Sequence, residues 1–153
     1  GLTRMNKLFL ERKVKKTYLA VVTDRPNPLK GHLTHYLQKD RDRNRTHAYN
    51  TQRYKDAKKA DLDYELKASI ANHHLIVVKP ETGRPHQIRV QLSRLGCPIR
   101  GDLKYGSIIK NRAGTIHLHS YKLEFIHPIK KEPVTITAFP PREQIWNTFR
   151  GLL

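Results

Sequence analysis

The sequence has very little sulfur: Cys97 is the only cysteine among 153 residues, and there is one methionine. A single thiol cannot form a disulfide within the chain, and it excludes the zinc sites that are built from several thiolates. Low use of cysteine is typical of proteins in a reducing compartment. We therefore expect a cytoplasmic protein with no structural metal ion.

Long apolar runs are also missing. No stretch of the sequence approaches the roughly 20 apolar residues that a membrane helix needs. The N-terminal residues 1–5 lack the signal-peptide pattern of a charged region followed by an apolar one. We therefore expect no membrane partner.

Acidic residues are scarce. The chain has 13 aspartates and glutamates against 30 lysines and arginines, which gives a formal net charge of +17. Such an excess favours a polyanionic partner, because each neutralised phosphate releases counterions and adds affinity. RNA is the expected partner, whether the protein is an enzyme or a basic structural component.

The length and the hydrophobic content of 37% predict one domain, residues 1–153. Apolar residues at helical spacing or in alternation indicate the elements. The expected helices are 2–13, 84–95 and 144–149, and the expected strands are 16–23, 31–38, 61–71, 74–79, 116–125 and 133–138; residues 46–54 are ambiguous. Short turns join most strands. We predict an α+β domain with a mixed, mainly antiparallel sheet and flanking helices on one side.

Two segments carry candidate RNA contacts. The loop 39–45 has six charged residues among seven, and we expect Arg41, Arg43 and Arg45 to contact RNA. The segment 83–89 lies where an expected strand turns into an expected helix, and the backbone N–H groups at a helix start favour an anion. Here Arg84, His86 and Gln87 are the RNA-binding candidates, with His86 and Gln87 also suited to organising the backbone.

Arg89 lies one turn inside the expected helix. Its guanidinium can hold a carboxylate or a phosphate with two parallel hydrogen bonds, and it stays charged when water is removed. From the residues alone, a surface phosphate clamp and a holder of a catalytic anion are equally good interpretations.

Three segments of the sequence resemble, in order, the motifs of the RluA-type pseudouridine synthases. The first is Lys-Thr-Tyr-Leu-Ala at 16–20. The second runs from Gly-Arg-Pro-His-Gln-Ile-Arg-Val at 83–90 through Pro-Ile at 98–99 and Gly-Asp at 101–102 to Tyr-Gly at 105–106. The third is Ile-His-Leu-His-Ser at 116–120, where Ser120 replaces the alanine usual in the family. The resemblance spans about residues 1–140.

The resemblance implies a fold and a reaction. The family isomerises uridine to pseudouridine in ribosomal or transfer RNA, and it needs neither cofactor nor metal. By motif position, Tyr18 would stack on the flipped uracil and take part in the proton step at C5. Arg89 would pair with the family's essential aspartate, and Leu118 would pack under the base. An aromatic face, a cation beside a carboxylate and an apolar floor suit these roles.

The family's essential aspartate belongs to a His-Arg-Leu-Asp segment that this sequence does not contain. We therefore expect the chain to be the C-terminal portion of a pseudouridine synthase catalytic domain, with the N-terminal part missing, and to be inactive alone. Apolar surface left uncovered in such a fragment would also favour self-association.

Two alternatives stay open. The first is a non-catalytic RNA-binding module that uses the same basic groove. The second is a histidine metal site that combines His117 and His119, which alternate on one strand face, with His73, His74 or His86. No carboxylate or thiolate stands at a matching spacing, which argues against the metal site.

Overall fold

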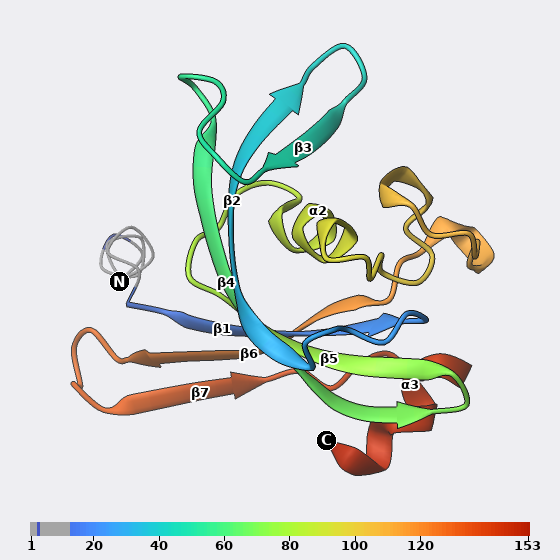
Figure 1. Ribbon diagram of the computed structural model, residues 1–153. Helices are drawn as coiled ribbons and strands as arrows, with labels where there is room; N and C mark the ends of the chain where they lie inside the picture. The colour runs from blue at the N-terminus through green and yellow to red at the C-terminus, as the bar shows by residue number, and fades with distance from the viewer. Residues whose placement is uncertain (1–2, 4–12) are drawn as a thin grey trace.

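The computed structural model describes residue 3 and residues 13–153, and these residues form one sheet with helices on both of its faces (Figure 1). The strand order is β3-β2-β4-β5-β1-β6-β7, and all pairs among the described strands are antiparallel. The strands are β1 Lys15–Val22, β2 Lys30–Asp40, β3 Arg45–Tyr49, β4 Lys58–Ile70, β5 His73–Pro80, β6 Leu118–Ile126 and β7 Pro133–Thr137.

The predicted α+β class is confirmed, and the predicted strands are found in their expected places. The parallel pairing implied by a mixed sheet is wrong for the described strands, because tight turns return the chain beside itself at β2–β3, β4–β5 and β6–β7. The ambiguous stretch 46–54 contains most of β3. The expected helix 2–13 lies outside the described residues, apart from its two members 3 and 13.

Alternation along β1 divides the core between two layers. Ala20 and Val22 join one buried cluster with Ile88 and Leu92 of α2, Gln87–Arg94. Leu19 and Val21 point the other way and join Trp146 and Phe149 of α3, Gln144–Phe149. The two helices therefore cover opposite faces, and the prediction that helices flank one side is wrong. Alternation requires this outcome, since β1 is apolar at every position from 19 to 22.

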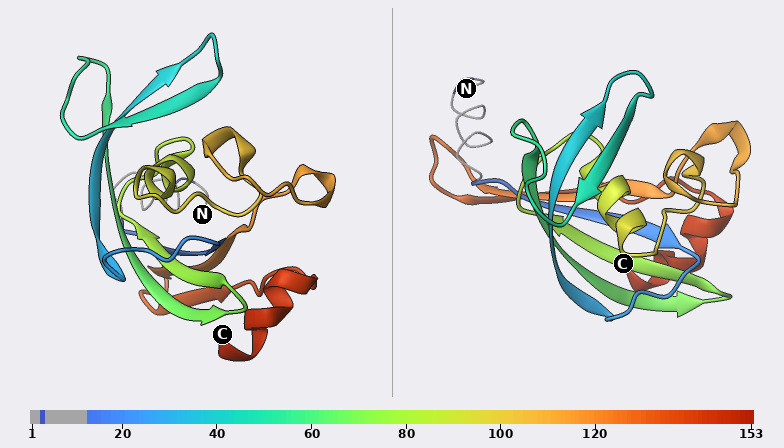
Figure 2. Two further views of the ribbon diagram at one scale, coloured as in Figure 1. Left: turned by 45° about the vertical axis from the view of Figure 1, so that its right-hand side comes forward. Right: turned by 45° about the horizontal axis from the view of Figure 1, so that its top comes forward.

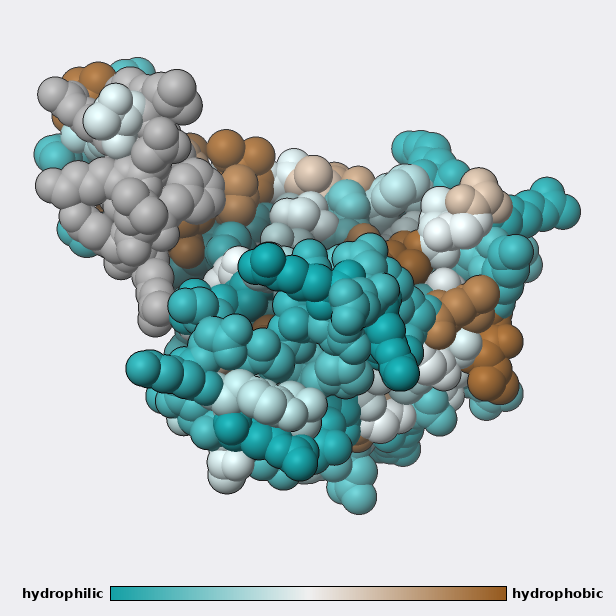
Figure 3. All heavy atoms as spheres, turned by 90° about the horizontal axis from the view of Figure 1, so that it is seen from above, coloured by the Kyte–Doolittle hydropathy of each residue, from teal (hydrophilic) through white to brown (hydrophobic). Residues whose placement is uncertain are grey.

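The helix α2 lies between two projecting walls. One wall is the β2–β3 hairpin, which rises from the sheet (Figure 1). The other is the connection from α2 to β6, which contains the 3₁₀ turns η1, Leu103–Tyr105, and η2, Arg112–Gly114 (Figures 1 and 2). A third such turn, η3 Arg150–Leu152, follows α3. Seen from above, from the side of the hairpin tip, the nearest surface is mostly hydrophilic (Figure 3).

Within the described residues, none of the helices is both long and apolar enough to span a bilayer.

Candidate active site

The loop before α2 is organised from inside by Gln87. Its Oε1 accepts hydrogen bonds from Thr82 Oγ1 at 2.7 Å and from the backbone N–H of Arg84 at 3.0 Å. Its Nε2 donates to the carbonyl of Asp61 at 3.0 Å. Gln87 is only 4% exposed. The structure therefore gives Gln87 an organising role in place of the RNA contact predicted from the sequence.

The other two candidates of this loop stay nearer the surface. Arg84 donates from Nε to the carbonyl of Lys59 at 2.9 Å. His86 caps α2 in a left-handed conformation with φ 57°, which is uncommon for a residue with a side chain. Burial, and next the charge of Arg89, lowers the pKa of His86. Both effects favour the neutral imidazole.

Arg89 has a partner within this chain. Its Nε and Nη2 donate to the two carboxylate oxygens of Asp102, each at 2.8 Å. Asp102 is 1% exposed, whereas the Arg89 side chain is 22% exposed. The hydrogen bond to Asp102 raises the pKa of Arg89. Among the described residues the partner of Arg89 is therefore the Asp102 carboxylate, while its pairing with the family's essential aspartate stays a prediction.

Tyr105 is a residue of the site that was not predicted from the sequence. Its hydroxyl accepts from the backbone N–H of Thr46 at 3.1 Å and lies 2.8 Å from Nδ1 of His86. The guanidinium carbons of Arg89 and Arg45 lie 4.9 and 5.5 Å from the centre of its ring. Tyr105 therefore joins α2, η1 and the β2–β3 hairpin. The Tyr-Gly end of the second motif was its only signal in the sequence.

The hairpin tip carries the other predicted RNA contacts. Arg41, Arg43 and Arg45 are all exposed at the turn between β2 and β3. Arg43 makes a long ion pair of 3.9 Å with Asp40, which leaves its charge in solvent. Further basic and aromatic side chains line a hollow of about 390 Å³ between this hairpin and α2; they include His47, Tyr49, Arg53 and Arg94.

Tyr18 and Leu118 meet on the α2 face of the sheet. Tyr18 pairs with Ser120 and Ala20 with Leu118, so Tyr18 and Leu118 lie on adjacent strands and point to the same side. Both are partly buried and pack against the cluster that contains Ile88. Arg89 is the next residue of α2 and therefore points about 100° away from Ile88, toward η1. The structure thus brings Tyr18 and Leu118 together, and it places Arg89 on the neighbouring side of the same helix.

The histidines of the alternative metal site have separate partners. His117 lies between Asn111 and Glu143, and His119 Nε2 lies 2.6 Å from the carbonyl of Ala138. His73 contacts the carbonyl of Ala71, His74 contacts Ser69, and His86 contacts Tyr105. No pair of these histidines belongs to a grouping, among the described residues, that could hold a metal ion.

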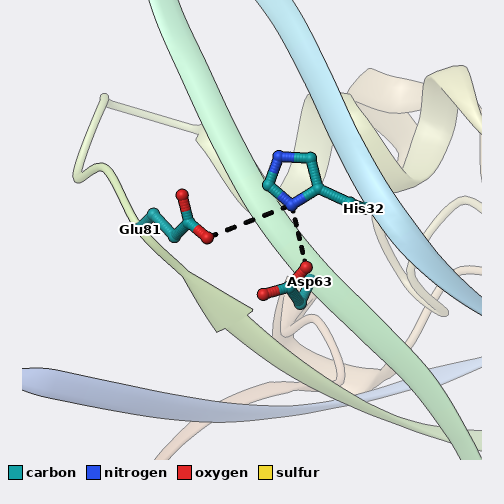
Figure 4. Close-up of side chains that lie close together, drawn as sticks. All are labelled: His32, Asp63 and Glu81. Carbon is teal, nitrogen blue, oxygen red and sulfur yellow. Dashed lines mark hydrogen bonds and ion pairs between the residues drawn. The ribbon is translucent and has the colours of Figure 1, made fainter.

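The described residues with metal-binding spacing are His32, Asp63 and Glu81 (Figure 4). Nδ1 of His32 lies 2.8 Å from Asp63 Oδ1 and 4.0 Å from Glu81 Oε1. All three side chains are exposed, and they lie on the face of β2 and β4 that α2 does not cover. The hydrogen bond that His32 donates to the Asp63 carboxylate raises the pKa of His32. We describe this group as a surface ion-pair cluster.

Comparison with known proteins places this geometry in a family. The family model described as RNA pseudouridylate synthase matches residues 1–94. The chain is 32% identical to ribosomal large subunit pseudouridine synthase D of Borreliella burgdorferi, over 88% of this chain and 40% of that protein. It is 34% identical to tRNA pseudouridine synthase C of Haemophilus influenzae, over 85% of this chain and 61% of that protein.

Solved structures agree with these relatives. Human RNA pseudouridylate synthase domain containing 1 superposes with a TM-score of 0.73 at 27% identity, over 94% of this chain and 63% of that one. Human RNA pseudouridylate synthase domain containing 4 has the same fold, with a TM-score of 0.75 at 24% identity over 97% of this chain and 66% of that one. The chain spans about 40 to 60% of the curated relatives named above. The chain belongs to the RNA pseudouridylate synthase family.

Proposed function

We propose that these residues are part of an enzyme that isomerises uridine to pseudouridine in ribosomal or transfer RNA. The observation that carries the proposal is the meeting of Tyr18 and Leu118 beside α2, within a chain that belongs to the family. In the reaction the N1–C1′ bond breaks, the uracil turns, and a C5–C1′ bond forms. C5 loses a proton and N1 gains one, so the product is an isomer of the substrate. The balance needs no oxidant or cofactor.

The residues of this chain suit distinct parts of that reaction. The ring of Tyr18 offers a face on which the uracil can stack, and its hydroxyl can take part in the transfer of the C5 proton. Leu118 provides an apolar floor that excludes water from the turning base. Arg89 holds positive charge beside the base without titrating, and its role is to orient a carboxylate.

The 153-residue chain alone is proposed to bind RNA without converting it. The carboxylate that Arg89 holds is Asp102, whose exposure of 1% keeps it from a substrate. This also supports the second candidate function, a non-catalytic RNA-binding module that uses Arg41, Arg43 and Arg45 on the exposed hairpin. The buried single cysteine fits a cytoplasmic location.

Release of tritium from RNA labelled with 5-³H-uridine tests the proposal. The assay compares the 153-residue chain with the product of the complete open reading frame that contains it. We expect release from the complete protein, its loss in Tyr18→Leu, and no release from the 153-residue chain. RNA binding without release from either protein would favour the binding module. Steady release from the 153-residue chain would refute the proposed need for a further carboxylate.

A further inference from the structure

A second cavity opens at the end of the sheet where β6 begins. It has a volume of about 990 Å³ and lies between the η2 loop and α3, which project at the same end of the sheet in all three ribbon views (Figures 1 and 2). Leu118 forms part of its wall, so the cavity adjoins the candidate active site. None of the RNA contacts predicted from the sequence lines it.

The charged side chains that line this cavity are mainly basic. Arg100, Lys110 and Arg112 supply three cations, and Lys110 and Arg112 are exposed at its rim. Glu143 is the one acidic side chain of the lining. Its Oε1 already accepts from the backbone N–H of Trp146 at 2.7 Å and lies 3.0 Å from Nε2 of His117. The net charge of the wall is therefore positive, and the Glu143 carboxylate is already engaged with Trp146 and His117.

Asn111 builds the wall from within. Its Nδ2 donates to the carbonyl of Thr115 at 2.9 Å and lies 2.9 Å from Nδ1 of His117, while its Oδ1 accepts from Arg100. Gly101, with φ +90°, lets the backbone pass beside it, since a Cβ there would lie 2.3 Å from Asn111 Nδ2. The Arg100 guanidinium is thus held by Asn111, which is itself fixed by Thr115 and His117.

Only part of the Arg100 guanidinium has a hydrogen-bond partner. Its Nη1 donates to Asn111, whereas its Nε is buried and has no hydrogen-bond partner among the residues that the structure describes. A buried donor without a partner is costly, and it favours an acceptor beyond the residues that the structure describes. An oxygen of a phosphate is such an acceptor, and the planar guanidinium suits it.

We propose that this cavity, the Arg100 cavity, binds the phosphodiester backbone of the RNA strand next to the nucleotide at Tyr18 and Leu118. This inference rests on the proposed function. Trp146, the one Trp, Tyr or Phe side chain of the lining, is 4% exposed and so has no free face for a base. The cavity therefore holds the strand through charge, independently of its sequence.

The dependence of RNA affinity on salt measures these contacts. The probe is a uridine-containing RNA stem–loop, titrated with the chain and with the double variant Lys110→Gln/Arg112→Gln. Each lost phosphate contact lowers the slope of log K against log salt by about 0.7 to 0.9, so the double variant is expected to lose roughly 1.5. Lys67→Gln/Lys79→Gln, which removes the same charge from the face opposite α2, is the control. An equal loss of slope in the control, or no loss in the variant, would overturn the inference.

Uridine monophosphate and inorganic phosphate are titrated in parallel. One outcome is that either ligand binds with micromolar affinity, that Arg112→Gln abolishes this binding, and that the salt slope for RNA is unchanged. The ligand of the cavity would then be a small phosphorylated molecule and not the RNA strand, which would overturn the inference. Tritium release by the complete protein separates the two proposals. If the double variant changes the salt slope but the complete protein releases no tritium, phosphate binding in the cavity is supported and the proposed reaction is refuted. If the complete protein releases tritium but the salt slope does not change, the reaction is supported and phosphate binding in the cavity is refuted.

Discussion

At the scale of single residues, the pair of Arg89 and Asp102 dominates the candidate site. Two hydrogen bonds of 2.8 Å join the side chains, and Asp102 is almost fully buried. Buried ion pairs are costly to break by removing one partner, because the other charge is left unpaired in a poor solvent. The pair therefore contributes to folding as well as to the electrostatics of the site.

Asp102→Asn is expected to lower the free energy of unfolding by about 3 kcal/mol, because it leaves the guanidinium without its counter-charge. Arg89→Met should lower it by a similar amount, and the double variant Arg89→Met/Asp102→Leu by less than the sum of the two. Urea denaturation followed by circular dichroism measures all three. Asp63→Asn, which removes a carboxylate that is 55% exposed, is the control and should change stability little. If the loss of stability in the double variant equalled the sum of the two single losses, the two side chains would not interact as a buried ion pair.

His35 should make the protein less stable as the pH falls. Its Nδ1 accepts from Nε2 of Gln91 at 2.9 Å, and burial, followed by the charge of Arg94, lowers the pKa of the ring. The unfolded chain binds a proton near pH 6.5, whereas the folded protein does so only at lower pH. The free energy of unfolding therefore decreases as the pH falls from 6.5 to the pKa of the folded protein, by about 1.4 kcal/mol for each unit between the two values.

Urea midpoints at pH 7.5 and pH 5.5 measure this effect of His35. The wild-type midpoint should fall over that range, and the fall should be smaller in His35→Gln. Equal falls in both proteins would assign the effect to other groups, such as His117, whose pKa is lowered by burial too.

At the scale of elements, the β2–β3 hairpin and α2 are tied together through η1. Tyr105 accepts the buried N–H of Thr46 and contacts His86, and its ring lies against the guanidinium groups of Arg45 and Arg89. A change at the basic hairpin can therefore be transmitted to the arginine of the candidate site through one aromatic ring.

Tyr105→Phe tests this connection. We expect a loss of about 1 to 2 kcal/mol in the free energy of unfolding, because the buried N–H of Thr46 loses its acceptor. Hydrogen exchange of the Thr46 amide should speed up in the variant. Tyr121→Phe, whose ring packs edge-on against Phe139, provides the matched control and should leave both measurements unchanged. Unchanged protection of Thr46 in Tyr105→Phe would argue against the connection.

The sequence predicted the elements well and their contacts poorly. Alternation located the strands, and helical spacing located α2 and α3, because both patterns are local. The partner of Arg89 was missed because Asp102 follows it by 13 positions across a turn and an irregular loop. The burial of Gln87 was missed as well, since its bonds to Thr82 and Asp61 depend on where β4 passes the loop. Local patterns contain no information on such contacts.

At the scale of the whole molecule, the described sheet ends in two edge strands, β3 and β7. Around β7 several apolar side chains are about half exposed: Ile126, Ile129, Ile136 and Phe139. A free strand edge with apolar neighbours favours pairing with another chain. This supports the self-association expected from the sequence.

We predict that the 153-residue chain forms dimers or larger species as its concentration rises into the micromolar range. Ile136→Lys places a charge on the exposed edge strand and should shift the population toward monomer. Sedimentation velocity measures the distribution, with Ile108→Lys as the control because Ile108 is 96% exposed but lies far from β7 in the chain. A monomer at all concentrations would contradict the prediction.

The central place of β1 has a consequence for the order of folding. β1 is the first described strand of the chain, yet its neighbours in the sheet are β5 and β6. During synthesis the β2–β4, β4–β5 and β1–β5 pairs can form before β6 leaves the ribosome, whereas the β1–β6 pair forms only afterwards. Such long-range pairings close late and slow folding. Tyr18 and Leu118 meet across the β1–β6 pair, so the proposed catalytic floor is assembled in one of the last steps of folding.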